Sequence, residues 1–161
     1  MAARGCSTAD GTTLLRMLES AADRLAVDAG ALDALNVFPV PDGDTGTNLL
    51  LTVRAALAAA TATVRPGDAV SPPPTASAMS AAMARGALEG ARGNSGIILS
   101  QFFRGLAVVL EGRDLCAPAD LAAAFVRAEA LARAGISNPT EGTILTVLGD
   151  VARALADDGP V

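Results

Sequence analysis

Two basic residue types are missing from this 161-residue chain: it has no lysine and no histidine, and all twelve of its basic residues are arginine. Without lysine the chain has no Walker-type phosphate loop, because that motif requires one. Without histidine a Ser-His-Asp hydrolase and a histidine-ligated zinc site are excluded. The formal charge of −5 gives no basic footprint for nucleic acid, so we expect no nucleic-acid partner.

Cysteines and long apolar runs are also scarce. The two cysteines, Cys6 and Cys116, form no framework of the kind that staples small secreted domains. Residues 1–11 lack the apolar core of a signal peptide. No apolar run approaches the roughly 20 residues that span a bilayer. These absences predict a cytoplasmic protein with no membrane span.

Apolar residues recur at helical spacing along most of the chain, with no strand-like alternation. Since 51% of the residues are apolar, we predict one all-α domain over residues 1–161. Six helices are expected. The first covers about 10–28 and follows a Ser7–Asp10 capping box, and the second carries Leu49 to Ala60. The third runs from about Met79 to Arg92, the fourth starts near Ile98, the fifth runs from Pro118 to Gly135, and the sixth starts near Gly142. The proline-rich residues 65–75 are expected to form a mobile loop.

Short connections between sequential helices favour an up-and-down antiparallel bundle, in which alternate helices share one direction. The second, fourth and sixth helices then begin at the same end. Three conspicuous segments are expected to meet there: DGDTGTN (42–48), RGNSG (92–96) and NPTEGT (138–143). Each helix start offers unpaired N–H groups and the positive end of a dipole, so the three together predict an anion-binding site.

Two aspartates, Asp42 and Asp44, flank one glycine in the first of these segments. Mg²⁺ takes one or two protein carboxylates and completes its coordination with water and phosphate oxygens, so the pair suits magnesium beside a phosphate. Taken alone, both residues are equally typical of turns and N-caps. An EF-hand is excluded, because with Asp42 in the first loop position the last is Val53, where glutamate is required.

The glycine pair of GNSG allows the backbone to approach a phosphate closely, and Asn94 and Ser95 add an amide and a hydroxyl. Arg92 is a candidate for stabilising charge on a transferred phosphoryl group. Thr143 is a candidate donor to the same ligand. The sequence leaves simpler interpretations open: Ser95 as the N-cap of the fourth helix, Arg92 as a surface cation and Thr143 as a first-turn cap of the sixth helix.

Three segments together resemble one family: LNVFPVPDGDTGTN (35–48), GARGNSGIILSQFFRG (90–105) and PTEGTILTV (139–147). In order and spacing they are similar to the N-terminal domain of the fatty-acid kinase A subunit, a DhaL-like domain of the dihydroxyacetone kinase nucleotide-binding superfamily. The resemblance implies a closed barrel of eight antiparallel helices that binds ADP or ATP at one end through two Mg²⁺ ions held by aspartates. About six of those helices fall within this chain, which implies a domain truncated at its C-terminus, with an exposed apolar seam that favours a homodimer.

By this resemblance Asp42 and Asp44 are the metal ligands, and with Arg92 they are the candidate catalytic residues. Dihydroxyacetone kinase subunits have a third carboxylate upstream, where the nearest residue here is Asn36, the candidate third ligand. They also have a histidine after the second aspartate, where this chain has Thr45. The implied nucleotide and phosphate contacts are Thr45, Gly46, Thr47, Asn48, Gly93, Asn94, Ser95, Gly96 and Thr143.

The expected function is transfer of the γ-phosphoryl group of Mg-ATP to a small acceptor presented by a partner protein. The resemblance implies that the acceptor is a fatty-acid carboxylate delivered by a DegV-like fatty-acid-binding protein and converted to an acyl phosphate. Three alternatives stay open: phosphorylation of dihydroxyacetone, binding of Mg-nucleotide without turnover, and a helical interaction module that binds no ligand.

Overall fold

The computed structural model describes residues 8–37, 41–64, 72–136 and 139–157. Within these ranges the chain forms six helices: α1 (Gly11–Ala34), α2 (Thr45–Thr61), α3 (Ala76–Glu89), α4 (Gly93–Val109), α5 (Pro118–Ala134) and α6 (Ile144–Asp157). Apart from an isolated backbone bridge between Ala9 and Cys116, no β-structure is present in the described ranges. The predicted all-α fold is therefore confirmed. None of these six helices is long and apolar enough to cross a membrane.

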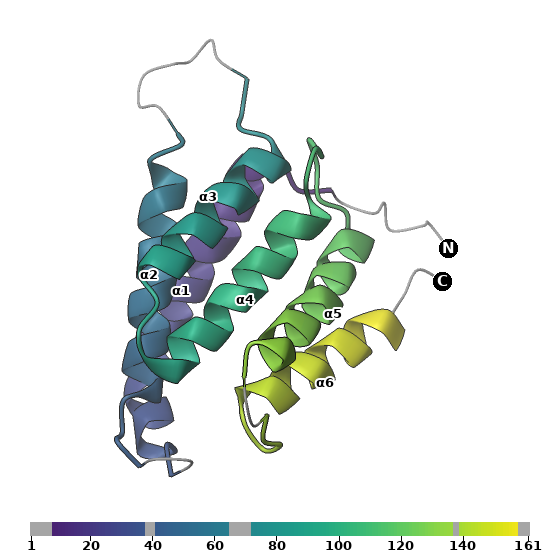
Figure 1. The fold of residues 1–161 in the computed structure, drawn as a ribbon. Coiled ribbons are helices and arrows are strands. Elements are labelled where there is room, and N and C mark those ends of the chain that lie inside the picture. The colour runs from purple at the N-terminus through teal and green to yellow at the C-terminus, as the bar shows by residue number, and fades with distance from the viewer. Residues whose placement is uncertain (1–7, 38–40, 65–71, 137–138, 158–161) are drawn as a thin grey trace, which may run out of the picture.

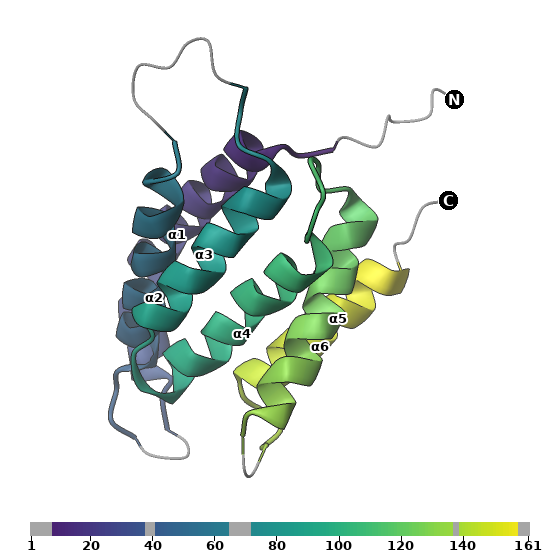
Figure 2. The same cartoon turned by 45° about the horizontal axis from the view of Figure 1, so that its top comes forward.

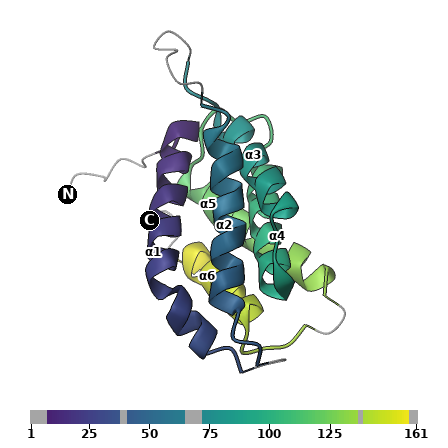
Figure 3. The same ribbon diagram turned by 90° about the vertical axis from the view of Figure 1, so that its left-hand side faces the viewer.

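Successive helices run antiparallel, so α2, α4 and α6 all begin at one end of the bundle (Figure 1). Helix α4 lies between the α1–α3 group and the α5–α6 pair (Figure 2). Viewed from the side, α2 stands between α1 and the α3–α4 layer, and it packs on all three (Figure 3). In the part of the chain that the structure describes, α1 packs on neither α5 nor α6, so the bundle is open along that edge.

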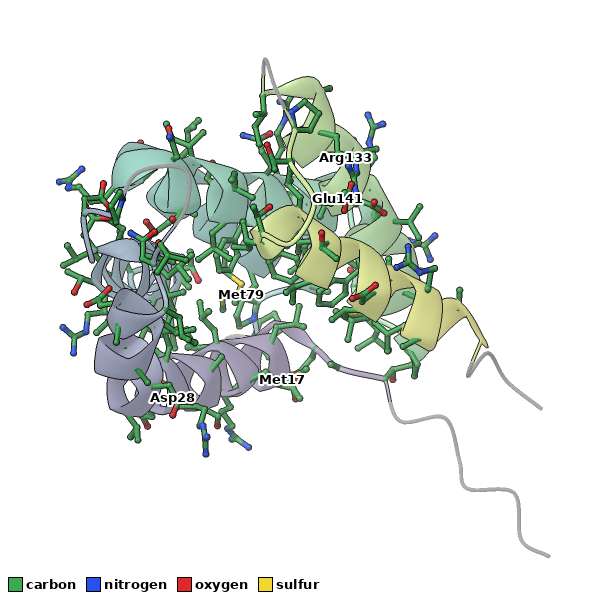
Figure 4. All side chains as sticks on the ribbon, turned by 90° about the horizontal axis from the view of Figure 1, so that it is seen from below. Met17, Asp28, Met79, Arg133 and Glu141 are labelled. Atoms are coloured by element: carbon green, nitrogen blue, oxygen red, sulfur yellow. The ribbon has the colours of Figure 1, made fainter. Side chains whose placement is uncertain are left out.

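The core is built from two clusters that meet on α4. The main cluster is rich in alanine, and Met79 lies fully buried in the middle of the bundle (Figure 4). A smaller cluster under α6 contains Leu145 and Leu148. Phe102 connects the two, because its ring centroid lies 5.3 Å from that of Phe103 and 4.8 Å from that of Phe125. Helix α4 thereby fixes the α5–α6 pair against the rest of the bundle.

Two helices end at other positions than the sequence predicted. Helix α1 does not stop near residue 28 but continues to Ala34. The additional residues bury Ala29, whose carbonyl oxygen would overlap a Cβ placed on Gly46, so this part of α1 packs tightly on the start of α2. Helix α3 ends at Glu89, short of the expected residue 92, with Gly90 as its C-cap.

The starts of α1, α2 and α4 also differ from those that the sequence predicted. Asp10 caps α1 by accepting a hydrogen bond from the Thr13 N–H at 2.7 Å, while Ser7 lies outside the described residues. Helix α2 begins at Thr45 and α4 at Gly93. The sequences TGTN and GNSG, expected as loops ahead of these helices, are therefore their first turns, and their backbone N–H groups belong to the helix starts themselves.

Backbone hydrogen bonds tie three chain segments together at the opposite end of the bundle. Ala9 and Cys116 exchange two N–H···O bonds of 2.8 Å. The Gly11 N–H donates to the Pro74 carbonyl oxygen at 3.0 Å. The segment before α1, the segment before α3 and the α4–α5 connection are thus held side by side. Of the proline-rich loop predicted to be mobile, residues 65–71 lie outside the described ranges.

Candidate functional site

Asp42 and Asp44 lie on a tight turn directly ahead of α2. Gly43 between them has a φ of 65°, a left-handed conformation that glycine adopts without steric strain. The Asn36 side-chain amide donates a hydrogen bond to Asp42 Oδ1 at 2.5 Å. The structure therefore brings the candidate third ligand, Asn36, next to one of the two predicted carboxylates.

Asp44 occupies the N-cap position of α2, yet its side chain makes no capping hydrogen bond. An aspartate at this position normally accepts one from the second or third amide of the helix. Here Asp33, near the end of α1, accepts instead, from the Thr47 N–H at 3.0 Å and from the Thr47 hydroxyl at 2.7 Å. Asp44 thus holds the N-cap position that the simpler interpretation gave it, but its carboxylate is not engaged by the helix start.

Sequence reasoning missed Asp33. The hydrogen bonds from Thr47, the backbone N–H above all, lower the pKa of Asp33 below its ordinary value of 3.8, so this carboxylate is ionised at neutral pH. The first helix was predicted to end near residue 28, so Asp33 lay outside it. A longer helix would have put it one turn before Asn36 and within reach of the α2 start.

The first turns of α2 and α4 lie in contact. Gly93 has a φ of 57°, and a Cβ placed on it would come within 2.5 Å of the Asn48 side-chain amide. The Ser95 hydroxyl lies 3.4 Å from the Thr45 hydroxyl, to which it donates. The structure therefore brings two of the three predicted segments together. Ser95 is not the N-cap of α4, because Arg92 holds that position.

Thr52 is a second residue that sequence reasoning missed. It is completely buried, its hydroxyl donates to the Asn48 carbonyl oxygen at 2.8 Å, and it accepts a hydrogen bond from the Arg92 N–H at 3.3 Å. A Cβ on Gly96 would overlap the same hydroxyl. Thr52 therefore sets how closely α4 approaches α2. A threonine on the apolar face of a predicted helix was the available signal.

Two predicted residues are engaged elsewhere. The Arg92 guanidinium is exposed and donates to the Ala91 carbonyl oxygen at 3.2 Å. The Thr143 hydroxyl donates to the Thr140 carbonyl oxygen at 2.8 Å and accepts from the Leu145 N–H at 3.3 Å, so it caps the first turn of α6. Across the residues that the structure describes, no hydrogen bond joins Thr143 to segments 42–48 or 92–96. The third segment therefore lies at the same end of the bundle as the other two, but Thr143 forms no hydrogen bond with them in the described residues.

The residues around Asp42 offer oxygen atoms as possible metal ligands. Among the described residues, no group of three or more His, Cys, Asp or Glu side chains is arranged to hold a metal ion. The oxygens of Asp42, Asp44 and Asn36 are hard donors of the type that Mg²⁺ prefers, and Mg²⁺ commonly keeps several waters and shares phosphate oxygens. The residues present therefore fit a magnesium ion completed by a phosphate ligand, and do not fit a metal cage made by protein alone.

A cavity of about 270 Å³ opens between α4 and the C-terminal part of α5. Its walls are mainly apolar, with Gln101 and Arg104 as polar residues among Ile97, Ile98, Leu131 and Ile136. Ile97 directly follows the first turn of α4. The cavity therefore begins on α4 next to the GNSG turn, although no residue of that turn lines it.

Comparison with known proteins gives the family of this chain. The DAK2 domain matches residues 39–160. Protein YloV of Bacillus subtilis is 41% identical over 146 residues, which cover 91% of this chain and 25% of that protein. Uncharacterised proteins of Staphylococcus epidermidis and Staphylococcus saprophyticus are 37% and 39% identical, over 94% and 92% of this chain and 26% and 25% of their own lengths. The chain thus spans about a quarter of the length of these curated relatives. By these matches the chain belongs to the DAK2 domain family, a family of kinase-related, nucleotide-binding domains.

Proposed function

We propose that this chain binds Mg-ATP and Mg-ADP at the end of the bundle where α2 and α4 begin, and that it positions the γ-phosphoryl group for transfer. One observation carries the proposal: Asp44 stands at the start of α2 without a capping bond, because Asp33 satisfies the Thr47 amide in its place. This leaves the Asp42–Asp44 pair for a cation next to the α4 start. Membership of a nucleotide-binding family supports the same assignment.

The two helix starts have different tasks in this proposal. Asp33 already places a negative charge at the first turn of α2, which makes that turn a poor site for a phosphate. The first amides of α4, at Gly93, Asn94 and Ser95, precede the intrahelical bond from the Gly96 N–H to the Arg92 carbonyl oxygen at 2.9 Å. We assign the phosphates to these α4 amides.

On the metal side, Asp42, Asp44 and Asn36 would hold Mg²⁺. When bound, the ion neutralises charge on the phosphate oxygens and keeps the phosphoryl group in one orientation. The nucleoside would then follow α4 away from the phosphates. Because Ile97 directly follows the GNSG turn and the helix rises about 1.5 Å per residue, the cavity beside Ile97 and Gln101 begins within one helical turn of the proposed phosphates.

Thermal unfolding with and without magnesium tests this proposal. Mg²⁺ with ADP should raise the melting temperature, because ligand at about 100 times its dissociation constant adds roughly 2.7 kcal/mol to the free energy of unfolding. Asp42→Asn and Asp44→Asn should each abolish the shift while the unliganded protein melts normally. Asp23→Asn, on an exposed position of α1, is the matched control and should keep it. An equal shift in the presence of EDTA would contradict the metal assignment.

For the acceptor we propose a fatty-acid carboxylate, presented in the cytoplasm by a separate DegV-like fatty-acid-binding protein. A carboxylate with a pKa of about 4–5 is already ionised at neutral pH, so its attack on the γ-phosphorus requires no general base. A hydroxyl acceptor usually requires one. This chain has no histidine, and its two candidate site carboxylates are assigned to the metal, which favours the carboxylate.

Hydroxylamine trapping separates the acceptors. The full-length protein, ATP, Mg²⁺, fatty acid and the acyl-binding partner should together yield an acyl hydroxamate, and Asp44→Asn should abolish it. Triose phosphate formed from dihydroxyacetone, without hydroxamate, would assign the chain to dihydroxyacetone kinase activity instead. Mg-nucleotide binding with neither product would assign it a role as a nucleotide-binding scaffold.

A further inference from the structure

The Thr52 hydroxyl is a polar group buried where α2 and α4 meet. Thr52 is completely buried, and its hydroxyl proton is donated to the Asn48 carbonyl oxygen at 2.8 Å, so its oxygen faces α4 as an acceptor. That oxygen accepts from the Arg92 N–H at 3.3 Å. Because Arg92 is the N-cap of α4, one buried oxygen joins the interior of α2 to the residue directly ahead of the α4 amides.

The same hydroxyl is connected to the turn that carries the two aspartates. The Asn48 N–H donates to the Asp44 carbonyl oxygen at 2.8 Å, and the Asn48 carbonyl oxygen accepts from Thr52. A series of three hydrogen bonds therefore leads from the backbone of Asp44, through Asn48 and Thr52, to the backbone of Arg92.

Packing holds the other end of the first turn of α4 against the same oxygen. A Cβ on Gly96 would overlap the Thr52 hydroxyl, so the backbone at Gly96 lies directly on it. The Gly96 N–H donates to the Arg92 carbonyl oxygen at 2.9 Å and closes the turn. Both ends of this turn thus contact Thr52, which fixes where the amides of residues 93–95 between them lie relative to α2.

We propose that Thr52 is a positioning residue for Mg-nucleotide: it sets the separation between the Asp42–Asp44 turn and the amides of residues 93–95. The inference rests on the proposed function, in which the metal is held on the α2 side and the phosphates on the α4 side. Thr52 itself touches neither. Without its hydroxyl the Arg92 N–H loses its acceptor, and bringing the two sides to the right separation becomes part of the cost of binding.

A buried hydroxyl with two hydrogen-bond partners also suits an ordinary helix interface, so loss of stability alone does not distinguish a positioning role from a structural one. The ligands do. Mg-ADP engages both sides of the proposed site and depends on their separation. Mg²⁺ alone engages only the α2 side, and ADP in EDTA engages only the α4 side, so neither depends on it.

The test measures the affinity for these three ligands by titrations followed through amide NMR signals, which also report weak binding. Thr52→Val keeps the branched shape and removes the hydroxyl. It should bind Mg-ADP about tenfold more weakly, the size of effect that lost supporting hydrogen bonds have at metal sites. Its affinities for Mg²⁺ alone and for ADP in EDTA should equal those of wild type. Thr52→Ser, which keeps the hydroxyl, should regain most of the Mg-ADP affinity.

Thr61→Val is the matched control. Thr61 is an exposed residue at the end of the same helix, and its hydroxyl makes the same kind of bond, to the Leu57 carbonyl oxygen at 2.8 Å. It should stay within about twofold of wild type, because distant sites act independently. Gly96→Ala disturbs the same contact from the α4 side. It should also weaken Mg-ADP binding and leave binding of Mg²⁺ alone unchanged, which keeps the inference testable if Thr52→Val does not fold.

The outcomes separate this inference from the proposed function. If wild type and Thr52→Val bind Mg-ADP equally well, the inference is wrong and the proposed function stands. A loss of affinity for all three ligands in Thr52→Val, or an equal loss in Thr52→Ser or Thr61→Val, would show a structural role and overturn the positioning role. If wild type binds no Mg-ADP, the proposed function fails and this inference fails with it.

Discussion

Asp33 and Thr47 lie fourteen positions apart in the sequence and are joined by two hydrogen bonds. The Thr47 N–H donates to one oxygen of the Asp33 carboxylate at 3.0 Å, and the Thr47 hydroxyl donates to the other at 2.7 Å. The end of one helix thereby caps the start of the next from outside. Because the cap comes from Asp33, the residue at the N-cap position itself, Asp44, keeps its carboxylate for another partner.

The first prediction concerns pH. The pKa of Asp33 in the folded protein lies below its ordinary value of 3.8, chiefly because the Thr47 N–H donates to the ionised carboxylate. A group whose folded-state pKa is depressed stabilises the protein above its unfolded-state pKa, and that contribution is lost as the pH falls through the folded-state value. Asp33→Asn should therefore lower the melting temperature at neutral pH, and its difference from wild type should shrink below about pH 3.8.

Circular dichroism melts across this pH range provide the measurement, with Asp23→Asn on the exposed side of α1 as control. The control should follow the wild-type curve throughout. A difference between wild type and Asp33→Asn that stays constant into acid would show that the ionised carboxylate does not stabilise the α2 start.

The second prediction concerns the close approach of α1 and α2. Gly46→Ala places a Cβ on the Ala29 carbonyl oxygen, so it should lower the free energy of unfolding by about 1–3 kcal/mol, as overpacking does. Gly30→Ala, inside α1 with no atom within 4 Å of the new Cβ, should raise it by about 0.5–1 kcal/mol. Urea unfolding at constant m-value measures both. Equal effects of the two substitutions would contradict the tight packing at Gly46.

The third prediction separates backbone strain from crowding at the proposed phosphate site. Gly93 and Gly112 both have positive φ, at 57° and 72°, so alanine at either should cost about 1–2 kcal/mol of stability. Only Gly93→Ala also places a Cβ within 2.5 Å of the Asn48 amide. Mg-ADP affinity should therefore fall in Gly93→Ala and stay unchanged in Gly112→Ala. Unchanged affinity in both would argue against phosphate binding at the start of α4.

The fourth prediction concerns Asn36. Its amide donates to Asp42 at 2.5 Å, so Asn36→Asp exchanges that bond for repulsion between two carboxylates. The variant should melt below wild type in EDTA and regain the loss when Mg²⁺ and ADP are added, because a cation between the oxygens removes the repulsion. Asn36→Ala, which has no oxygen to offer, should not regain it. The same melting behaviour for both variants would exclude position 36 from the metal site.

The number and direction of the helices could be predicted from the sequence, because apolar spacing and short connections determine them locally. The helix boundaries at the site could not. Thr45–Asn48 and Gly93–Gly96 contain glycine, threonine and asparagine, which favour turns in isolation, yet both form first turns of helices. What makes them helical is tertiary: Thr47 bonds to Asp33 on α1, and Gly93 and Gly96 pack against side chains of α2.

The candidate site shows the same division. The spacing of Asp42 and Asp44 suggests them as candidates, and helix direction predicts the meeting of α2 and α4 that the structure shows. The supporting roles of Asp33 and Thr52 could not be predicted, because each residue acts through a partner on another element. Asp33 is a half-buried charge of a kind common on helical surfaces, and Thr52 is a threonine on an apolar helix face whose partner the sequence does not name.

Hydrogen bonds between main-chain groups and hydrogen bonds that involve side chains place different demands on the amino-acid sequence. At the end away from the proposed site, Ala9, Pro74 and Cys116 are held through main-chain groups, which most amino acids supply equally well. At the other end the geometry depends on particular side chains, such as Asp33 and Thr52. The main-chain bonds at the first end therefore tolerate a change of side chain, except where a main-chain approach is as close as that of Gly11 to Pro74.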